Sequence, residues 1–145
     1  MNITKLIDSF SGDYDFLSNF HPSPVLLDGI EYPTVEHAYQ AAKTLDKEQR
    51  KAIQLAETPG KAKKLGQKVD IREEWELIKL LVMSNLLIQK FDVPGLHSLL
   101  IATGDAKLVE GNWWHDTYWG VCDGKGKNHL GKLLMQIRDN SLMLS

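Results

Sequence analysis

Apolar and polar positions near the N-terminus predict short strands before the pattern changes to helical spacing. Two apolar runs between Pro24 and Pro33 flank an Asp28-Gly29 pair. Such a pair is typical of a two-residue hairpin turn, because this turn needs positive φ at both central positions. We therefore expect two short antiparallel strands here, and an extended apolar segment at residues 16–20.

After these strands the pattern predicts a series of helices. Five residues have side-chain oxygens suited to the N-cap position: Thr34, Asp46, Thr58, Asp70 and Asn128. The expected spans are residues 35–45, 47–57, 59–66, 72–91 and 94–102, with a last helix after residue 128. Nine of the twelve residues from 77 to 88 are apolar, so we expect the longest helix at the centre, wrapped by its neighbours.

Composition and charge narrow the class of protein. The 145 residues are enough for one domain, and we expect residues 1–145 to form it. Hydrophobic residues at 43% and charged residues at 25% exclude disorder as the main state, and a net charge of −2 excludes a polycation that coats nucleic acid. No apolar run approaches the ~20 residues of a membrane span, and the N-terminus lacks the pattern of a secretory signal. A cytoplasmic protein is expected.

The helix expected at residues 35–45 has candidate chemistry on one face. Glu36, Tyr39, Gln40 and Lys43 share that face, and small alanines occupy the opposite one. Glu36 and Lys43 are two turns apart, about 10 Å along the axis, so both can reach one ligand. The alternative is an ordinary amphipathic helix whose polar face lies in water. Helical spacing alone leaves both interpretations open.

A second candidate segment lies before the last helix, where three of the four tryptophans fall within seven residues. Asp116 lies between Trp113 and Trp119, and a carboxylate beside apolar rings binds its proton more tightly. Aromatic faces suit stacking on a nucleobase. The alternative is that the tryptophans fill the core and Asp116 caps a turn. Lysines also cluster at residues 61–68, where a solvated face is expected.

Other chemistry lacks its markers. The patterns GxGxxG, GxxxxGK[ST] and GxSxG are absent. The only cysteine, Cys122, cannot form an internal disulfide or a cysteine-based zinc site. The histidines are too scattered for a metal site, so no metal is expected. Two classes remain: an enzyme that combines Glu36, Asp116 and Lys43, or a non-catalytic module that binds a planar, phosphorylated ligand.

Several separated blocks, in order, resemble the NADAR family, named for NAD and ADP-ribose. The resemblance covers about residues 14–138. Its blocks are FLSNF at 16–20, YPTVEHAYQAAK at 32–43, TGD at 103–105, LVE at 108–110, WHD at 114–116, WG at 119–120 and NHLGKLLMQIR at 128–138, with Arg72, Trp75, Lys79, Met83, Lys90 and Phe91 between them. Some relatives have a cysteine cluster after Trp-Gly, where this chain has only Cys122, so a zinc knuckle is not expected.

The resemblance implies an α+β fold, mainly helical, with a small antiparallel sheet near the N-terminus. It implies an N-glycosidase that cleaves the bond between ribose C1 and a base nitrogen, without a cofactor. The substrate would be a phosphorylated ribosyl intermediate of riboflavin biosynthesis, or ADP-ribosylated guanine, including guanine in a nucleic acid. The alternative is an ADP-ribose or NAD-binding module without turnover.

The resemblance also assigns residues to the site. The catalytic set would be Glu36, Lys43 and Asp116, which we expect to converge on one pocket. The substrate-binding set would be Ser18, Asn19, Phe20, Tyr39, Gln40, Arg72, Trp75, Lys79, Trp113, Trp119 and Gly120. A carboxylate stabilises the oxocarbenium character that develops at C1. Lys43 would either anchor a phosphate or attack C1 and form an imine with the opened sugar.

Overall fold

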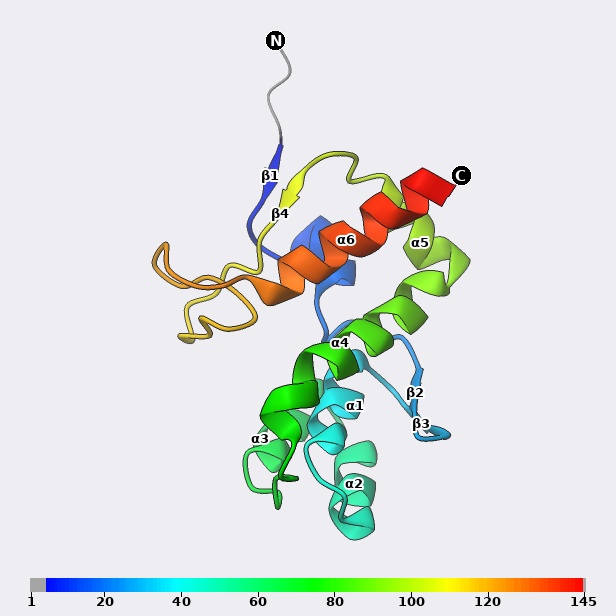
Figure 1. The fold of residues 1–145 in the computed structure, drawn as a ribbon, viewed down its shortest axis with the longest axis vertical. Coiled ribbons are helices and arrows are strands. Elements are labelled where there is room, and N and C mark those ends of the chain that lie inside the picture. The colour runs from blue at the N-terminus through cyan, green and yellow to red at the C-terminus, as the bar shows by residue number, and fades with distance from the viewer. Residues whose placement is uncertain (1–4, 145) are drawn as a thin grey trace. The chain divides into compact units, whose positions relative to one another are not determined.

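The computed structural model describes residues 5–144, which form two compact units (Figure 1). Unit 1 contains residues 5–18 and 91–144, and unit 2 contains residues 19–90. Within the described residues there are six α-helices and one 3-10 helix, together with a two-stranded antiparallel sheet near the N-terminus. The expected α+β, mainly helical fold is confirmed. The expectation of a single domain stays a prediction.

Unit 2 begins with the predicted hairpin. Strand β2 (Val25–Leu27) pairs with β3 (Ile30–Tyr32), and Leu27 lies opposite Ile30. The two residues between them, Asp28 and Gly29, have φ of 49° and 80°. Positive φ at both positions is the geometry that an Asp-Gly turn favours, so the prediction of the turn and both strands is confirmed.

Three of the predicted helix N-caps are also confirmed. Helix α1 is Val35–Ala42, α2 is Lys47–Gln54 and α3 is Pro59–Gly66. Thr34, Asp46 and Thr58 each accept backbone N–H bonds from the first turn that follows. Helix α1 ends at Ala42, before the predicted residue 45, and the carbonyls of Lys43 and Thr44 accept from Arg72 and Arg50 instead of continuing the helix.

The longest helix, α4 (Trp75–Asp92), differs from the prediction in two ways. Asp70 does not cap it: the Asp70 N–H donates to the Gln49 side chain at 2.9 Å, and the carboxylate accepts from the same amide at 3.2 Å. Asp70 therefore ties the loop to α2, and the helix starts at Trp75. The helix is also not wrapped on all sides, because Leu77 is 88% exposed and Leu81 is 72% exposed.

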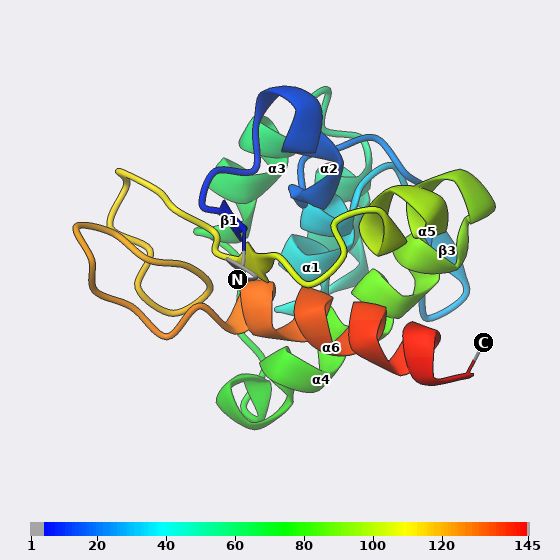
Figure 2. The same cartoon turned by 90° about the horizontal axis from the view of Figure 1, so that it is seen from above.

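Unit 1 contains a short parallel pair that the sequence did not predict, between β1 (Leu6–Ile7) and β4 (Lys107–Leu108). Helix α6 (His129–Leu144) packs against β4 and α5 (Pro94–Ile101), as Figure 2 shows. Within this unit, Arg138 of α6 donates to the Ala106 carbonyl at 2.7 Å and to the Thr103 hydroxyl at 3.0 Å.

Two further predictions about unit 1 and its boundary are wrong. Residues 16–20 are not extended, because a 3-10 helix, η1 (Gly12–Leu17), includes the first two and a turn follows. Acidic residues in its first turn favour the helix. The Asn128 side chain does not cap α6: it accepts from the Glu110 N–H at 3.0 Å and donates to the Leu108 carbonyl at 3.0 Å.

Candidate active site

The face of α1 that the sequence offered as either a ligand site or a solvated surface is buried. Glu36 is 8% exposed, Tyr39 6% and Gln40 4%, and the alanines of the opposite face are at 0%. Figure 1 shows α2 and α3 beside α1, and the β2–β3 hairpin also contacts it. The interpretation as a surface helix is therefore wrong. A buried carboxylate on such a helix requires a compensating partner or a function.

The carboxylate of Glu36 has its partner one turn along the same helix. The Gln40 side-chain amide donates to Glu36 Oε2 at 2.6 Å. The Glu36 backbone N–H donates to the Asn19 carbonyl at 3.1 Å, which holds the first residue of unit 2 against the start of α1. Glu36 is thus fixed by α1 and by the segment that precedes the hairpin, within one unit.

Lys43 lies at the C-terminus of α1 beside two aromatic rings that are tilted by 55° to each other. Its Nζ is 5.8 Å from the Tyr39 ring centroid, and the Tyr39 and Trp75 rings are 5.2 Å apart. Burial lowers the pKa of Lys43, while the Glu36 carboxylate acts in the opposite direction. An amine with a lowered pKa is more often neutral at physiological pH, and is then a nucleophile.

Other cations surround this lysine. The ammonium groups of Lys63 and Lys79 lower the pKa of Lys43 further. Lys79 is paired with Glu76 at 2.6 Å, and its side chain is only 18% exposed. The Arg72 backbone N–H donates to the Lys43 carbonyl at 2.8 Å, and the Arg72 guanidinium pairs with Glu74. Cations held together in this way are typical of a site for an anion.

Lys63 is the site residue that sequence reasoning missed, because it was counted with the solvated lysines of residues 61–68. Ala62 and Gly66 of α3 are buried, one turn apart, and α3 packs on α1. Lys63 lies next to this buried stripe and is half-buried, whereas its neighbour Lys64 is exposed. The spacing of the small residues Ala62 and Gly66 was the signal that pointed to this face.

The segment of unit 1 with Trp113, Trp114 and Trp119 agrees in part with each of the two alternatives that the sequence left open. Asp116 Oδ1 accepts from the backbone N–H groups of Tyr118 at 3.1 Å and Trp119 at 2.9 Å, so this carboxylate does cap a turn. The tryptophans do not all fill the core, because Trp113 is 81% exposed and Trp114 is 43% exposed. One oxygen of Asp116 is fixed by the loop, and its catalytic role stays a prediction.

Gly120 is required by close packing inside the same loop. A Cβ atom there would lie 1.8 Å from Glu110 Oε2 and 2.1 Å from the Glu110 carbonyl oxygen. Asn112 joins the loop from within by donating to the Asp116 carbonyl at 2.9 Å. Gly120 thus closes the loop, and the expectation that it contacts substrate stays a prediction.

The predicted site residues are divided between the two units. Unit 2 brings together Glu36, Tyr39, Gln40, Lys43, Arg72, Trp75 and Lys79, and it also contains Asn19 and Phe20. Unit 1 contains Ser18, Trp113, Asp116, Trp119 and Gly120. The convergence of Asp116 with Glu36 and Lys43 stays a prediction.

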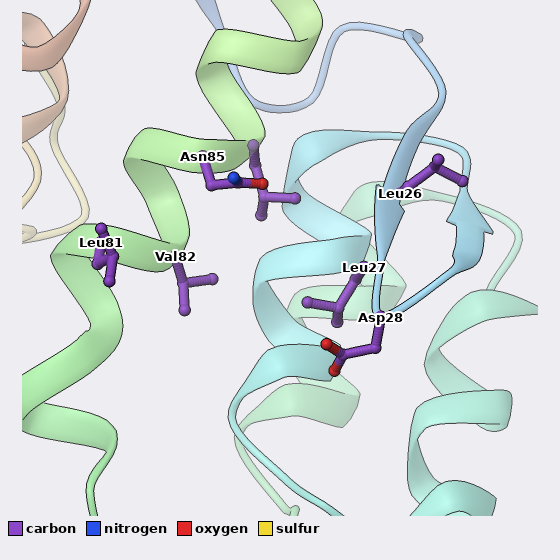
Figure 3. Close-up of a pocket in the computed structure, with 7 residues that line it drawn as sticks. Leu26, Leu27, Asp28, Leu81, Val82 and Asn85 are labelled. Carbon is purple, nitrogen blue, oxygen red and sulfur yellow. The ribbon is translucent and has the colours of Figure 1, made fainter.

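A hollow elsewhere in unit 2 is not lined by Glu36, Lys43 or the cations near them. It has a volume of about 300 Å³ and lies between the hairpin and α4 (Figure 3). Its lining is mostly apolar: Leu26, Leu27, Asp28, Leu81, Val82, Asn85 and Leu86. Its acid, Asp28, pairs with Arg50 at 2.7 Å. We therefore place the candidate active site at α1.

The described residues contain no cluster of three or more His, Cys, Asp or Glu side chains that would hold a metal ion. From residue 5 to residue 144, no helix has the length and apolarity needed to cross a bilayer.

Comparison with known proteins gives a consistent family. The NADAR domain matches residues 8–141. The N-glycosidase YbiA of Escherichia coli is 43% identical over 135 residues, which are 90% of this chain and 84% of that protein. The N-glycosidase Npun_R5314 of Nostoc punctiforme is 37% identical, over 87% of this chain and 85% of that protein.

Two further matches extend the comparison. The riboflavin biosynthesis protein VVA0006 of Vibrio vulnificus is 36% identical over 88% of this chain, but the match spans only 35% of that protein. The solved structure of E. coli YbiA superposes with a TM-score of 0.86 at 39% identity, over 99% of this chain and 89% of that chain. The names of these relatives support a glycosyl hydrolase, and the chain belongs to the NADAR family.

Proposed function

We propose that this NADAR-family N-glycosidase hydrolyses the bond between C1 of a 5-phosphorylated ribose and the amine of a pyrimidine, as in early riboflavin intermediates. The observation that carries the proposal is the buried Glu36 carboxylate with the amine of Lys43 on the same helix and further cations around it. The name of the Vibrio vulnificus relative supports the choice of substrate class.

The reaction divides into departure of the amine and addition of water. The C1–N bond breaks, its electron pair stays with the pyrimidine nitrogen, and that nitrogen takes a proton. Positive charge then spreads over C1 and the ring oxygen, where the Glu36 carboxylate stabilises it. Water adds at C1, either directly or after Lys43 has formed an imine there, and loses a proton, which leaves ribose 5-phosphate. Asp116 stays the predicted base for this water.

We expect the 5-phosphate of the substrate to bind near the lysines that surround Lys43. A charge-assisted hydrogen bond to a phosphate is stronger than a neutral one, and Lys63 and Lys79 both act on the pKa of Lys43. A phosphate held by Lys63 and Lys79 would leave the Lys43 amine to react at C1. The buried Tyr39 and Trp75 rings, tilted by 55° to each other, pack beside Lys43 and help to exclude water from its amine. The same parts would also suit the first phosphate of ADP-ribose, which the substrate test separates.

Replacing Lys63 by glutamine tests the phosphate site. We expect KM for the phosphorylated substrate to rise about tenfold or more, because a hydrogen bond to a charged group contributes about 1.5–3 kcal/mol. Inhibition by ribose 5-phosphate should weaken equally, and inhibition by ribose should not change. Lys64→Gln is the matched control, since it removes the same charge from an exposed position on α3. Equal effects of the two variants would contradict a phosphate contact at Lys63.

A substrate panel tests the proposed function itself. Phosphorylated and dephosphorylated ribosylaminopyrimidines, ADP-ribosylguanosine, an ADP-ribosylated oligonucleotide and NAD are each incubated with the protein. We expect free base from the phosphorylated pyrimidine substrate at the highest kcat/KM. Release of guanine derivatives with a steep loss of rate on added salt would favour modified nucleic acid instead. Binding without release of any base would favour the non-catalytic module.

A further inference from the structure

We propose that Gly66 of α3 is a positioning residue for Glu36, which it controls through the side chain of Gln40. The inference rests on the proposed role of Glu36 and adds a residue that does not touch the substrate. Its basis is a chain of contacts between α3 and α1 within unit 2, in which each link is buried.

The first link is the contact between Gly66 and Gln40. A Cβ atom at Gly66 would lie 1.9 Å from Gln40 Oε1, 2.7 Å from Cδ and 2.9 Å from Cβ. Ordinary contacts begin at 3.4 Å, so the amide oxygen would have to move by well over 1 Å. The short distance to Cβ matters most, because a change of rotamer does not move that atom. Gly66 is therefore the residue that leaves space for the Gln40 side chain.

The second link is the direction of the Gln40 amide. Its Nε2 donates to Glu36 Oε2 at 2.6 Å, while its Oε1 is buried without a hydrogen-bond partner among the described residues. A buried, unpartnered oxygen costs free energy. The amide keeps this orientation because the reverse one would turn the oxygen toward a carboxylate. The Gln40 amide therefore makes a hydrogen bond to Glu36 through its nitrogen, while its oxygen makes none.

The third link is the lack of room for an alternative. Gln40 is 4% exposed and Glu36 is 8% exposed, so neither side chain can swing into solvent to relieve a clash. A methyl group at position 66 must then displace the amide, and the carboxylate loses the partner that sets its direction. Catalytic groups lose rate steeply when they are misplaced by about 1 Å.

The test compares Gly66→Ala with Gly60→Ala, a matched substitution on the same helix. A Cβ at Gly60 meets only Thr58 Oγ1, at an ordinary 3.9 Å. With the phosphorylated ribosylaminopyrimidine, we expect Gly66→Ala to lower kcat by about 10- to 100-fold with little change in KM. Gly60→Ala should keep the kcat of the unchanged protein. Circular dichroism and the melting temperature establish that each variant is folded.

A double variant separates positioning from a general loss of structure. Gln40→Gly removes the hydrogen bond to Glu36 and also the three Gln40 side-chain atoms, Cβ included, that a methyl at position 66 would meet. We expect Gly66→Ala to have no further effect on kcat in the Gln40→Gly background, because residues that act as one unit are not additive. This pair also keeps the proposal testable if Gly66→Ala alone fails to fold. Losses that multiply would overturn it.

The result is separable from the proposed function. A folded Gly66→Ala variant with unchanged kcat overturns the positioning role, provided that Glu36→Gln is inactive. An active Glu36→Gln variant overturns the proposed function and with it the reason for positioning Glu36.

Discussion

Glu36→Gln is expected to lower kcat by about 10³-fold while the protein still binds its substrate. The neutral amide cannot stabilise positive charge at C1, and this charge develops only as the amine departs. An interaction made mainly in the transition state affects turnover more than affinity. Rates are measured by release of base, and affinity by calorimetry with ribose 5-phosphate.

The Glu36→Gln substitution removes the charge and preserves the local contacts of the side chain. Glutamine has the shape of glutamate, and its carbonyl oxygen can still accept the hydrogen bond that Gln40 donates at 2.6 Å. We therefore expect the fold and the melting temperature to be retained. Glu31→Gln, at an exposed position on β3, is the matched control and should be fully active. A Glu36→Gln enzyme with ordinary turnover would remove this carboxylate from the chemistry.

Lys43→Arg is expected to be inactive, because we expect the neutral amine of Lys43 to attack C1 directly. In that step Nζ bonds to C1, the pyrimidine amine leaves with a proton, the sugar ring opens, and water later hydrolyses the imine. Borohydride added during turnover should then leave a covalent sugar adduct on Lys43, detectable by mass spectrometry. Arginine keeps the charge but cannot become neutral. An active Lys43→Arg enzyme without an adduct would assign Lys43 to phosphate binding alone.

The pH dependence separates the same two roles by its sign. An attacking amine must be unprotonated, so kcat/KM should rise as the pH passes through the pKa of Lys43, which burial holds below its ordinary value. A lysine that only neutralises phosphate must be protonated, and kcat/KM would fall over the same range. Lys63→Gln removes a neighbouring positive charge, which raises the pKa of Lys43 and moves the rise to higher pH.

Local sequence rules predicted the hairpin and three helix starts, because each depends on only a few consecutive residues. The Asp28-Gly29 turn follows from φ preferences, and the caps at Thr34, Asp46 and Thr58 follow from one side-chain oxygen near a free N–H. The same rule was wrong at Asp70 and Asn128. Both side chains bond to residues distant in the sequence, Gln49 and residues 108 and 110, and no local pattern reports such partners.

At the candidate site, too, the local sequence predicted some features and the tertiary structure decided others. Helical spacing placed Glu36 and Lys43 on one face, but an amphipathic surface helix has the same spacing. Burial of that face depends on α2, α3 and the hairpin packing around α1, which is a property of the whole unit. Lys63 was missed for this reason: the spacing of Ala62 and Gly66 indicates a packed face of α3, but only the contact between α3 and α1 brings Lys63 near Lys43.

By itself, the sequence determined the family, the fold class, the hairpin and the residue types of the site. These features depend on motifs and backbone preferences of residues that are close together in the sequence. Only the tertiary structure decided which polar groups leave water. It buried Glu36 and Gln40, surrounded Lys43 with cations, and left Leu77 and Trp113 exposed. The physical reason is that desolvation and electrostatic coupling act through space, between residues that the chain separates by tens of positions.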